Sequence, residues 1–519
     1  MKKTMKQYSF ASRLKSLALV FGIALAFASC ANEDIAQNPN DKDNDANLTT
    51  FSTGDPATRT SMESDGKFFW EAGDKIYVKD DNGAWHASSN SPTGKTDNFK
   101  FKVPGTYTAH TSYEVYYPGK NGNQDQVTIS ASQSQVEPNT TAHFGAAGDC
   151  GMATATKVSG KQQFAFTLDH KAAYLLFLPR TSNTVLHNCY LTKVEVNSDN
   201  DITDTYTLNP TTGELTGTGT GKQIIVSTGG SGTYANGFPL TNNSTNVATN
   251  GSYVVIKPGT HTLKIRYWVK DIASNVEGFI TKTLAPQLYE KNKYYNITAN
   301  LNVPDYDGSK YYMWDAQQNY WAGHEWNTAN PWQSTLDGET KPNYPKSNSD
   351  SRWYHEGDGA FQATHSCATM PNINEMTWYA MKGDPRWDNE RLWTTMGHLY
   401  KGGMWFKKHD KIPGYSKTQA YDGTDWRTSA NAVNNYSLTP GLPSEADASD
   451  YFYLPALGFY FGGECHSIGR SSSIWSSSSN PAVGYYLKSA GMLTFGVGNT
   501  SVGCYADREY GARVDFVFE

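Results

Sequence analysis

The chain has 519 residues, enough for more than one buried core, and its formal net charge is −6. Since it has no basic excess, it lacks the electrostatic field that attracts nucleic acid, and we exclude a nucleic-acid partner. Aromatic residues make up 13% and charged residues only 18% of the chain. Aromatic side chains suit pleated sheets and the many Gly and Asn residues suit turns, so this composition predicts a mainly β, exported protein.

Residues 1–29 have the organisation of a signal peptide. Basic residues precede an apolar stretch at 17–28 that is too short for a permanent membrane span. The stretch ends in Ala28-Ser29-Cys30, which resembles the lipobox of bacterial lipoproteins, with Phe27 where Leu is more usual. The resemblance implies cleavage before Cys30, lipidation of its thiol and amino group with fatty acids such as palmitate, and anchoring to the outer membrane. The alternative is an ordinary signal peptide with a chance cysteine.

Residues 30–48 are rich in Asn, Asp and Gln and predict a flexible tether, because such a segment cannot bury apolar area. The acidic pair Glu33-Asp34 resembles the surface-export signal of Bacteroidota lipoproteins, which implies display outside the cell. The acidic run at 41–45 is not an EF-hand loop, because Ala46 and Ser52 stand where Gly and Glu are needed.

Short strands between turns are predicted from residue 49 to residue 303, and no helix is expected there. The segments 75–79, 113–117, 193–196 and 262–269 alternate between apolar and polar residues, as a strand with one buried face does. The continuous apolar run at 174–178 predicts a strand that is covered on both faces.

This half of the chain resembles a known family. Residues 58–60, 69–78, 116–118, 164–175 and 293–298 resemble, in matching order, segments of the fimbrillin-like proteins of Bacteroidota, the major and minor fimbrium subunits. The resemblance implies two transthyretin-like antiparallel β-sandwich domains, which we place at 49–165 and 166–303. It also implies a role as a fimbrial stalk, tip or anchor, or as a surface adhesin.

The resemblance further implies a way to assemble. In polymerising members of that family a protease cuts after an arginine and removes the first strand, and a strand of a neighbouring subunit fills the groove. Arg59 lies in the matching region, but we favour the simpler interpretation that residues 58–60 belong to an uncut first strand. An uncut chain, which keeps its lipid, fits an anchored or tip component better than a stalk subunit.

Residues 304–519 are predicted to form a third, Trp-rich domain after a turn-rich break. One helix is expected at 374–381, with Asn374 as N-cap and a stop at 383–385. Residues 453–456, 474–478, 485–487 and 508–514 resemble the Fibrobacter succinogenes major paralogous domain, which implies an α+β, C-type-lectin-like fold. Residues 308–370 match that pattern poorly.

Catalytic motifs are absent, including those of zinc proteases, serine hydrolases, P-loops and dinucleotide-binding folds, so we predict neither enzymatic activity nor a cofactor. His355, Glu356, His365 and Cys367 are near enough in sequence to imagine zinc, but they lack the usual ligand spacing, and no metal site is predicted.

Neither the acidic pairs nor the Cys465–His466 neighbours predict a catalytic site. A glycosidase would need two facing acids, and the available pairs, Glu356 with Asp358 and Asp384 with Asp388, are more typical of turns. Cys465 and His466 are neighbours on a predicted strand, so their side chains should point to opposite faces, and a disulfide or a buried thiol is the better expectation for Cys465.

Most tryptophans of the last domain should be core, but a minority can form an exposed platform on which sugars stack. The residues that we nominate for this platform are Trp387, Trp393, Trp426 and Trp475. The order of Trp387-Asp388-Asn389 is wrong for the calcium motif of C-type lectins, so calcium-dependent sugar binding is not expected.

Besides Cys30, five cysteines remain, an odd number for an oxidising compartment. At least one must therefore be unpaired or pair between chains. Cys150 and Cys189 precede the last domain, and any disulfide within a domain is expected among Cys367, Cys465 and Cys504.

These observations lead to one function and two alternatives. The leading hypothesis is a lipid-anchored surface adhesin or fimbrial tip or accessory subunit, whose last domain recognises host or microbial glycans or matrix proteins. The first alternative is a structural fimbrial subunit assembled by donor-strand exchange with other subunits. The second is a polysaccharide-binding or -processing surface protein.

Overall fold

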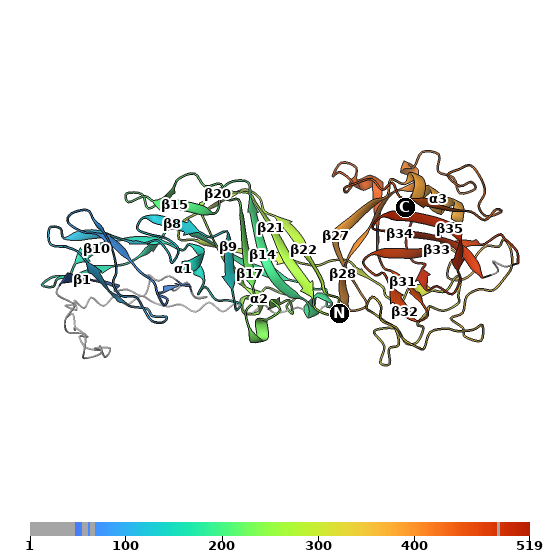
Figure 1. Ribbon diagram of the computed structural model, residues 1–519, viewed down its shortest axis with the longest axis horizontal. Helices are drawn as coiled ribbons and strands as arrows, with labels where there is room; N and C mark the ends of the chain where they lie inside the picture. The colour runs from blue at the N-terminus through green and yellow to red at the C-terminus, as the bar shows by residue number, and fades with distance from the viewer. Residues whose placement is uncertain (1–46, 54–60, 63–67, 485–487) are drawn as a thin grey trace, which may run out of the picture. The chain divides into compact units, whose positions relative to one another are not determined.

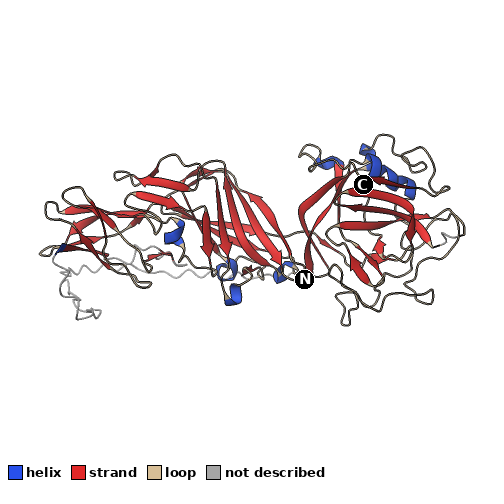
Figure 2. Cartoon of the chain, viewed as in Figure 1, coloured by secondary structure: helices blue, strands red, loops and turns tan. Residues whose placement is uncertain are grey.

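The computed structural model describes residues 47–53, 61–62, 68–484 and 488–519. The signal peptide, Cys30, most of the tether, Arg59 and residues 485–487 lie outside the described residues. Figure 2 shows that strands dominate the chain, so the predicted mainly β fold is confirmed. Within the described ranges, no helix has the length and apolar character needed to span a membrane.

The first sheet contains eight strands and is mixed rather than purely antiparallel. Its first strand, β1, lies in the interior of the sheet and pairs in parallel with β11 and antiparallel with β6. In spatial order the strands are β5 (Trp85–Ala87), β4 (Tyr77–Lys79), β7 (Ser112–Tyr117), β10 (Gly151–Lys157), β11 (Gln163–Phe166), β1 (Leu48–Thr53) and β6 (Lys100–Pro104), with β12 (Asp169–His170) beside β10.

Alternation with period two builds the core of this sheet. Along β1 every second side chain is buried, and along β7 Tyr113, Val115 and Tyr117 are buried as the alternation at 113–117 predicts, with Tyr116 buried in addition. The buried set is strongly aromatic and includes Phe51, Trp70, Phe101 and Tyr117. A two-stranded pair, β2 (Ser61–Met62) and β3 (Phe68–Phe69), also occurs in this part of the chain.

One six-stranded sheet, two three-stranded sheets and one two-stranded sheet follow, and buried residues of all four share one apolar core. In the six-stranded sheet, five strands lie in the order β22 (Val276–Thr283), β21 (Leu263–Asp271), β14 (Tyr190–Ser198), β17 (Gln223–Thr228) and β9 (Ser132–Gln135). The sixth, β18 (Phe238–Pro239), pairs with β14. The other sheets are β19 (Ser252–Ile256), β13 (Ala173–Arg180) and β24 (Tyr294–Asn300); β16 (Leu215–Thr216), β15 (Asp204–Leu208) and β8 (Gln126–Ile129); and β20 (Gly259–His261) with β23 (Gln287–Tyr289). Residues 173–177 of β13 are all buried, as their continuous apolar run predicts.

Hydrogen bonding crosses the predicted division near residue 165. Strands β8 and β9 precede this position, yet they pair with β15 and β17, which follow it. Gln133 and Gln135 of β9 also bond through their side-chain amides to the backbone of Val255 and Tyr253. Sequence order alone therefore does not assign these strands, and the boundaries at 165 and 303 stay predictions.

Short helices correct one expectation for residues 49–303. Helix α1 (Phe144–Ala147) and helix α2 (Val247–Asn250) each form a single turn where no helix was predicted. Segments of four residues are too short to show a helical period, so the sequence pattern cannot reveal them.

The C-terminal part of the chain contains three further sheets, and α3 (Ile373–Lys382) contacts strands of the six-stranded one (Figure 1). The four-stranded sheet is β25 (Asp305–Tyr306), β27 (Arg386–Thr395), β28 (His398–Lys407) and β30 (Tyr451–Pro455). The six-stranded sheet is β26 (Tyr311–Tyr312), β36 (Ala512–Arg513), β33 (Ser471–Ser479), β34 (Ser489–Gly496), β35 (Asn499–Asp507) and β29 (Ala432–Asn435), and β31 (Phe459–Phe461) pairs with β32 (Glu464–His466).

The predicted helix is present, but its cap is a different residue. Asn372, not Asn374, is the N-cap, and it forms a capping box with Glu375. The sequence carries this signal, because an Asn three residues before a Glu at a helix start is the pattern of that box. The amide of Asn374 is instead buried and donates to Asp425. The helix ends before Gly383, as expected.

The predicted disulfides among the last cysteines are absent. Each of the five cysteines in the described part of the chain is buried and takes part in no disulfide bond. Cys465 lies on β32 with its side chain buried while that of His466 is half-buried, as adjacent strand positions require. Each of the five belongs to a buried apolar cluster, where a free cysteine packs as a small apolar residue, and the sequence does not reveal this packing.

Candidate functional site

A polar groove of about 590 Å³ is the first candidate site, and it lies in the segment that matched no family pattern. Two half-buried aromatic side chains, Trp332 and Tyr344, contribute to its wall. The groove is lined by Trp332, Pro342, Asn343, Tyr344, Lys346, Ser347, Ser349, Asp350, Ser351 and Arg352. Aromatic faces and fixed polar groups on one wall are typical of sites that bind polar ligands with apolar faces.

The polar wall of the groove is held in place by a bidentate ion pair. Arg352 donates through Nη2 to Asp350 Oδ2 at 2.7 Å and through Nε to Oδ1 at 3.0 Å. These hydrogen bonds from Arg352 lower the pKa of Asp350, so the carboxylate is charged at neutral pH. The remaining Nη1 of Arg352 donates to the backbone carbonyls of Tyr320 and Asn343.

The aromatic side of the groove is also supported. The imidazole of His324 stacks on one face of the Trp332 indole, and Lys346 Nζ lies 4.8 Å from the centre of the Tyr344 ring. Both aromatic side chains of the groove are thus held by a neighbouring side chain.

The four tryptophans predicted as a platform do not form one. Trp393, Trp426 and Trp475 are buried, and each indole N–H donates within the domain, to Gly402, Asp422 and Tyr312 respectively. Trp387 alone is partly exposed. These rings are core because a small sheet domain needs large apolar side chains, and sequence alone cannot tell a core ring from an exposed one.

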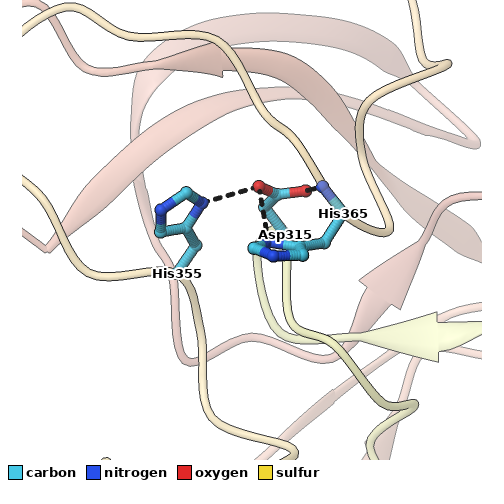
Figure 3. A group of neighbouring side chains, drawn as sticks. All are labelled: Asp315, His355 and His365. Carbon is cyan, nitrogen blue, oxygen red and sulfur yellow. Dashed lines mark hydrogen bonds and ion pairs between the residues drawn. The ribbon is translucent and has the colours of Figure 1, made fainter.

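A second candidate site joins Asp315 with two histidines, as Figure 3 shows. His355 Nδ1 lies 2.7 Å and His365 Nδ1 lies 3.5 Å from the same carboxylate oxygen, Oδ2 of Asp315. The Asp315 carboxylate is fully buried, while the two imidazoles are 29% and 38% exposed. One buried anion therefore faces two rings that solvent can reach.

The Asp315 carboxylate is fixed by backbone donors from the loop that carries His365. It accepts N–H hydrogen bonds from Thr364, His365 and Cys367 at 2.8, 2.7 and 3.1 Å. Asp315 itself has a φ of +50°, an unusual conformation for a residue other than glycine. Such a backbone persists where the surroundings determine it, often at functional positions.

Two of the four residues considered for zinc from the sequence belong to this cluster, and two do not. The Glu356 carboxylate turns away and accepts from Trp353 Nε1 at 3.3 Å. Cys367 accepts the N–H of Asp315 through Sγ at 3.1 Å, and burial raises the pKa of its thiol well above the ordinary value. Asp315 was missed because it lies 40 residues before His355, and no local spacing connects them.

The carboxylate pair Asp384 and Asp388 has structural partners. Asp384 forms an ion pair with Arg386 at 2.9 Å. Asp388 accepts from the backbone N–H groups of Glu390 and Arg391 and from the indole of Trp405. Both carboxylates thus serve turns and packing, as the sequence interpretation favoured.

Strand β1 is a third feature with functional meaning. Phe51 is buried and stacks on Phe164 of β11, with 5.1 Å between ring centres, and it meets Tyr107 edge-on. Its neighbours hold the strand on both sides, since Gln163 Nε2 donates to Ser52 Oγ at 2.7 Å and the Phe99 N–H donates to Thr53 Oγ1 at 2.9 Å. Removal of β1 would expose the edges of both β11 and β6.

Comparison with known proteins gives distant likenesses. No protein-family model matches the chain, and no curated protein matches it. A "putative cell adhesion protein" from Bacteroides ovatus ATCC 8483 has 16% identity and a TM-score of 0.30, over 48% of this chain and 92% of the other. A fimbrial protein from the same strain has 10% identity and a TM-score of 0.28, over 90% and 98%. A "putative cell adhesion protein" from Bacteroides uniformis ATCC 8492 has 15% identity and a TM-score of 0.25, over 51% and 95%.

These TM-scores lie below 0.5 and the identities below 25%. The likenesses are therefore distant in both sequence and structure.

Proposed function

We propose that this chain is a lipid-anchored cell-surface adhesin, a fimbrial tip or accessory component, that binds glycans through the groove at residues 332–352. The single observation that carries the proposal is the pairing of aromatic faces, Trp332 and Tyr344, with a fixed, charged Asp350–Arg352 pair on one wall. The C–H face of a sugar ring stacks on such rings while its hydroxyls bond to carboxylate, guanidinium and amide groups.

The rest of the chain fits this role. The lipobox ending in Cys30 and the acidic pair after it predict an anchor facing the exterior. A tether of Asn- and Asp-rich sequence then leads into β1. Along the chain, the strands β1 to β26 lie between this tether and the groove. An adhesin needs no reacting groups, which agrees with the structural roles of Asp384 and Asp388.

A glycan array probed with the exported chain tests the proposal. We expect binding to a subset of mucin-type or polysaccharide glycans, and we expect Trp332→Ala to abolish it. Trp387→Ala is the matched control, because Trp387 is also half-buried, lies in the same region and is outside the groove. Equal binding by the Trp332 and Trp387 variants, or no binding by the unchanged chain, would contradict glycan recognition at the groove.

A second candidate, donor-strand assembly, is favoured by the position of β1. An interior strand that carries one core phenylalanine and is followed by Arg59 is what strand replacement requires. Cleavage after Arg59 would leave the folded sheets joined to the lipid only through the noncovalent contacts of β1, which are its hydrogen bonds and the packing of Phe51. Exchange of β1 for a strand of another subunit would then release the chain into a polymer.

Treatment with an arginine-specific protease separates the two candidates. Assembly predicts a cut after Arg59, loss of the β1 peptide and a ladder of oligomers on a denaturant-free gel, all absent from an Arg59→Gln variant. A cut that leaves a monomer with β1 retained would contradict assembly and leave the anchored adhesin as the role of the chain.

A further inference from the structure

We propose that Asp315, His355 and His365 form a binding site for a divalent transition metal ion of the zinc type. The three residues each offer one ligand atom, and these atoms all lie within 4.8 Å of one another. Two ligands come from one loop and the third from the turn after β26, so an ion would cross-link parts of the chain that are 40 residues or more apart.

The distances suit an ion with little rearrangement. His355 Nδ1 and His365 Nδ1 lie 2.7 and 3.5 Å from Asp315 Oδ2. Zinc bonds to imidazole nitrogen and carboxylate oxygen measure about 2.0–2.2 Å, so ligands around one ion stand roughly 3–3.5 Å apart. The two rings are inclined by 67° with centres 5.1 Å apart, so they approach the shared oxygen from different directions.

The surroundings hold the ligands in position. Three backbone N–H groups orient the buried carboxylate. The ring of His355 stacks on Trp314 at an angle of 23°, and Phe361 packs against its edge. Trp314, Phe361 and Cys367 belong to one apolar cluster beneath the loops. Ligands fixed in this way by a second layer of contacts bind metals more tightly than mobile ones do.

The donor set determines the class of ion. Two imidazoles and one carboxylate suit Zn²⁺, Co²⁺, Ni²⁺ or Cu²⁺, whereas Ca²⁺ and Mg²⁺ prefer oxygen alone. Three protein ligands leave a fourth position open, and the partly exposed imidazoles provide access from solvent. Cys367 Sγ accepts the backbone N–H of Asp315 and is not among the ligand atoms that lie within 4.8 Å of one another.

Cobalt titration of the exported chain tests the site, because Co²⁺ bound to nitrogen and oxygen ligands absorbs visible light and Zn²⁺ displaces it. We expect one Co²⁺ per chain and full displacement by one equivalent of Zn²⁺. The double variant His355→Ala with His365→Ala should bind at least about 100-fold more weakly, since loss of even a supporting contact costs about 10–100-fold.

His466→Ala is the matched control. Its side chain is 31% exposed and faces one carboxylate, Glu464, at 3.4 Å, but the described residues place no third ligand there. This variant should keep the affinity of the unchanged chain. Zn²⁺ should also raise the thermal unfolding midpoint of the unchanged chain and of the control, but not of the double variant.

Absence of visible absorption from the unchanged chain, or equal affinity in the double variant, would overturn the proposal. Should the double variant fail to fold, the conservative His365→Gln change replaces it, because this imidazole is the most exposed of the three ligands. Undiminished cobalt binding by the folded His365→Gln variant would equally overturn it.

Discussion

Residues 48–303 and residues 304–519 are stabilised in different ways. In the first region nearly half of the described residues lie in strands, and β21 pairs with β14 and with β22 over six or more positions each. In the second region, residues 313–372, all described, contain no helix or strand between β26 and α3. Both candidate ligand sites, the groove and the Asp315 cluster, lie largely in this irregular segment.

In residues 313–372, side-chain contacts take the place of hydrogen bonds between strands. The buried indole of Trp314 donates to the carbonyl of Ser476, and Arg508 lies over its ring at 4.5 Å. Burial lowers the pKa of Arg508 to about 10, but its guanidinium remains charged at neutral pH and donates to backbone carbonyls of Ser489, His355 and Gly357. A loop can therefore be held as firmly as a strand when buried polar groups satisfy its backbone.

The largest effect is expected for Trp314→Ala. It removes a fully buried ring from a segment that has no strand hydrogen bonding. It also leaves the carbonyl of Ser476 without the indole N–H that donates to it. The free energy of unfolding should fall by about 4–5 kcal/mol, at the upper end for Trp to Ala changes. Urea unfolding followed by Trp fluorescence measures this, with exposed Tyr436→Ala as the control. A loss no larger than that of the control would show that side chains do not stabilise this segment.

A smaller loss is expected for Phe51→Ala in the first region. The ring is buried between Phe164 and Tyr107, but the hydrogen bonds of β1 to β11 and β6 remain. The cost should be about 3 kcal/mol, at the lower end for Phe to Ala. Denaturant titration beside Thr50→Ala, a half-buried neighbour, checks it. Equal effects of the two changes would mean that the backbone hydrogen bonds to β11 and β6 alone hold β1 in the sheet.

A pH-dependent effect is expected at Asp425 in the second region. Hydrogen bonds from Arg427, and one from Asn374 of α3, lower the pKa of this carboxyl well below its ordinary value. The folded state then binds fewer protons than the unfolded state, so its contribution is present above the unfolded pKa of about 3.9 and is lost as pH falls toward the folded pKa.

Asp425→Asn should therefore cost about 1–2 kcal/mol at pH 7, reduced by partial exposure, and the gap from the unchanged chain should begin to narrow below about pH 4 and be smallest at the lowest pH. Thermal unfolding from pH 7 to pH 2.5 measures both values. A gap that stays constant with pH would exclude the carboxylate charge as its origin.

The smallest effect compares two helix caps. Asn372→Ala removes the capping box of α3, a helix of ten residues, and should cost about 1 kcal/mol. Asn246→Ala removes the exposed cap of α2, a helix of a single turn, and should cost less than about 0.5 kcal/mol. Both are measured by urea unfolding, and a larger loss at Asn246 would reverse the comparison.

The sequence determined the features that depend on near neighbours. Period-two alternation predicted β7, β14 and β21, the apolar run predicted the buried β13, and turn residues predicted the end of α3. These predictions succeed because the periodicity of a strand or helix can be recognised from residues two to four positions apart.

Only the tertiary structure decided which distant residues meet. It paired β1 with β11, more than 100 residues away, buried Trp393, Trp426 and Trp475, and brought Asp315 to His355 and His365. It also gathered Trp332 and Tyr344 into one groove with the Asp350–Arg352 pair. The physical reason is that burial and ligand geometry depend on packing between segments, and packing is not encoded in local spacing.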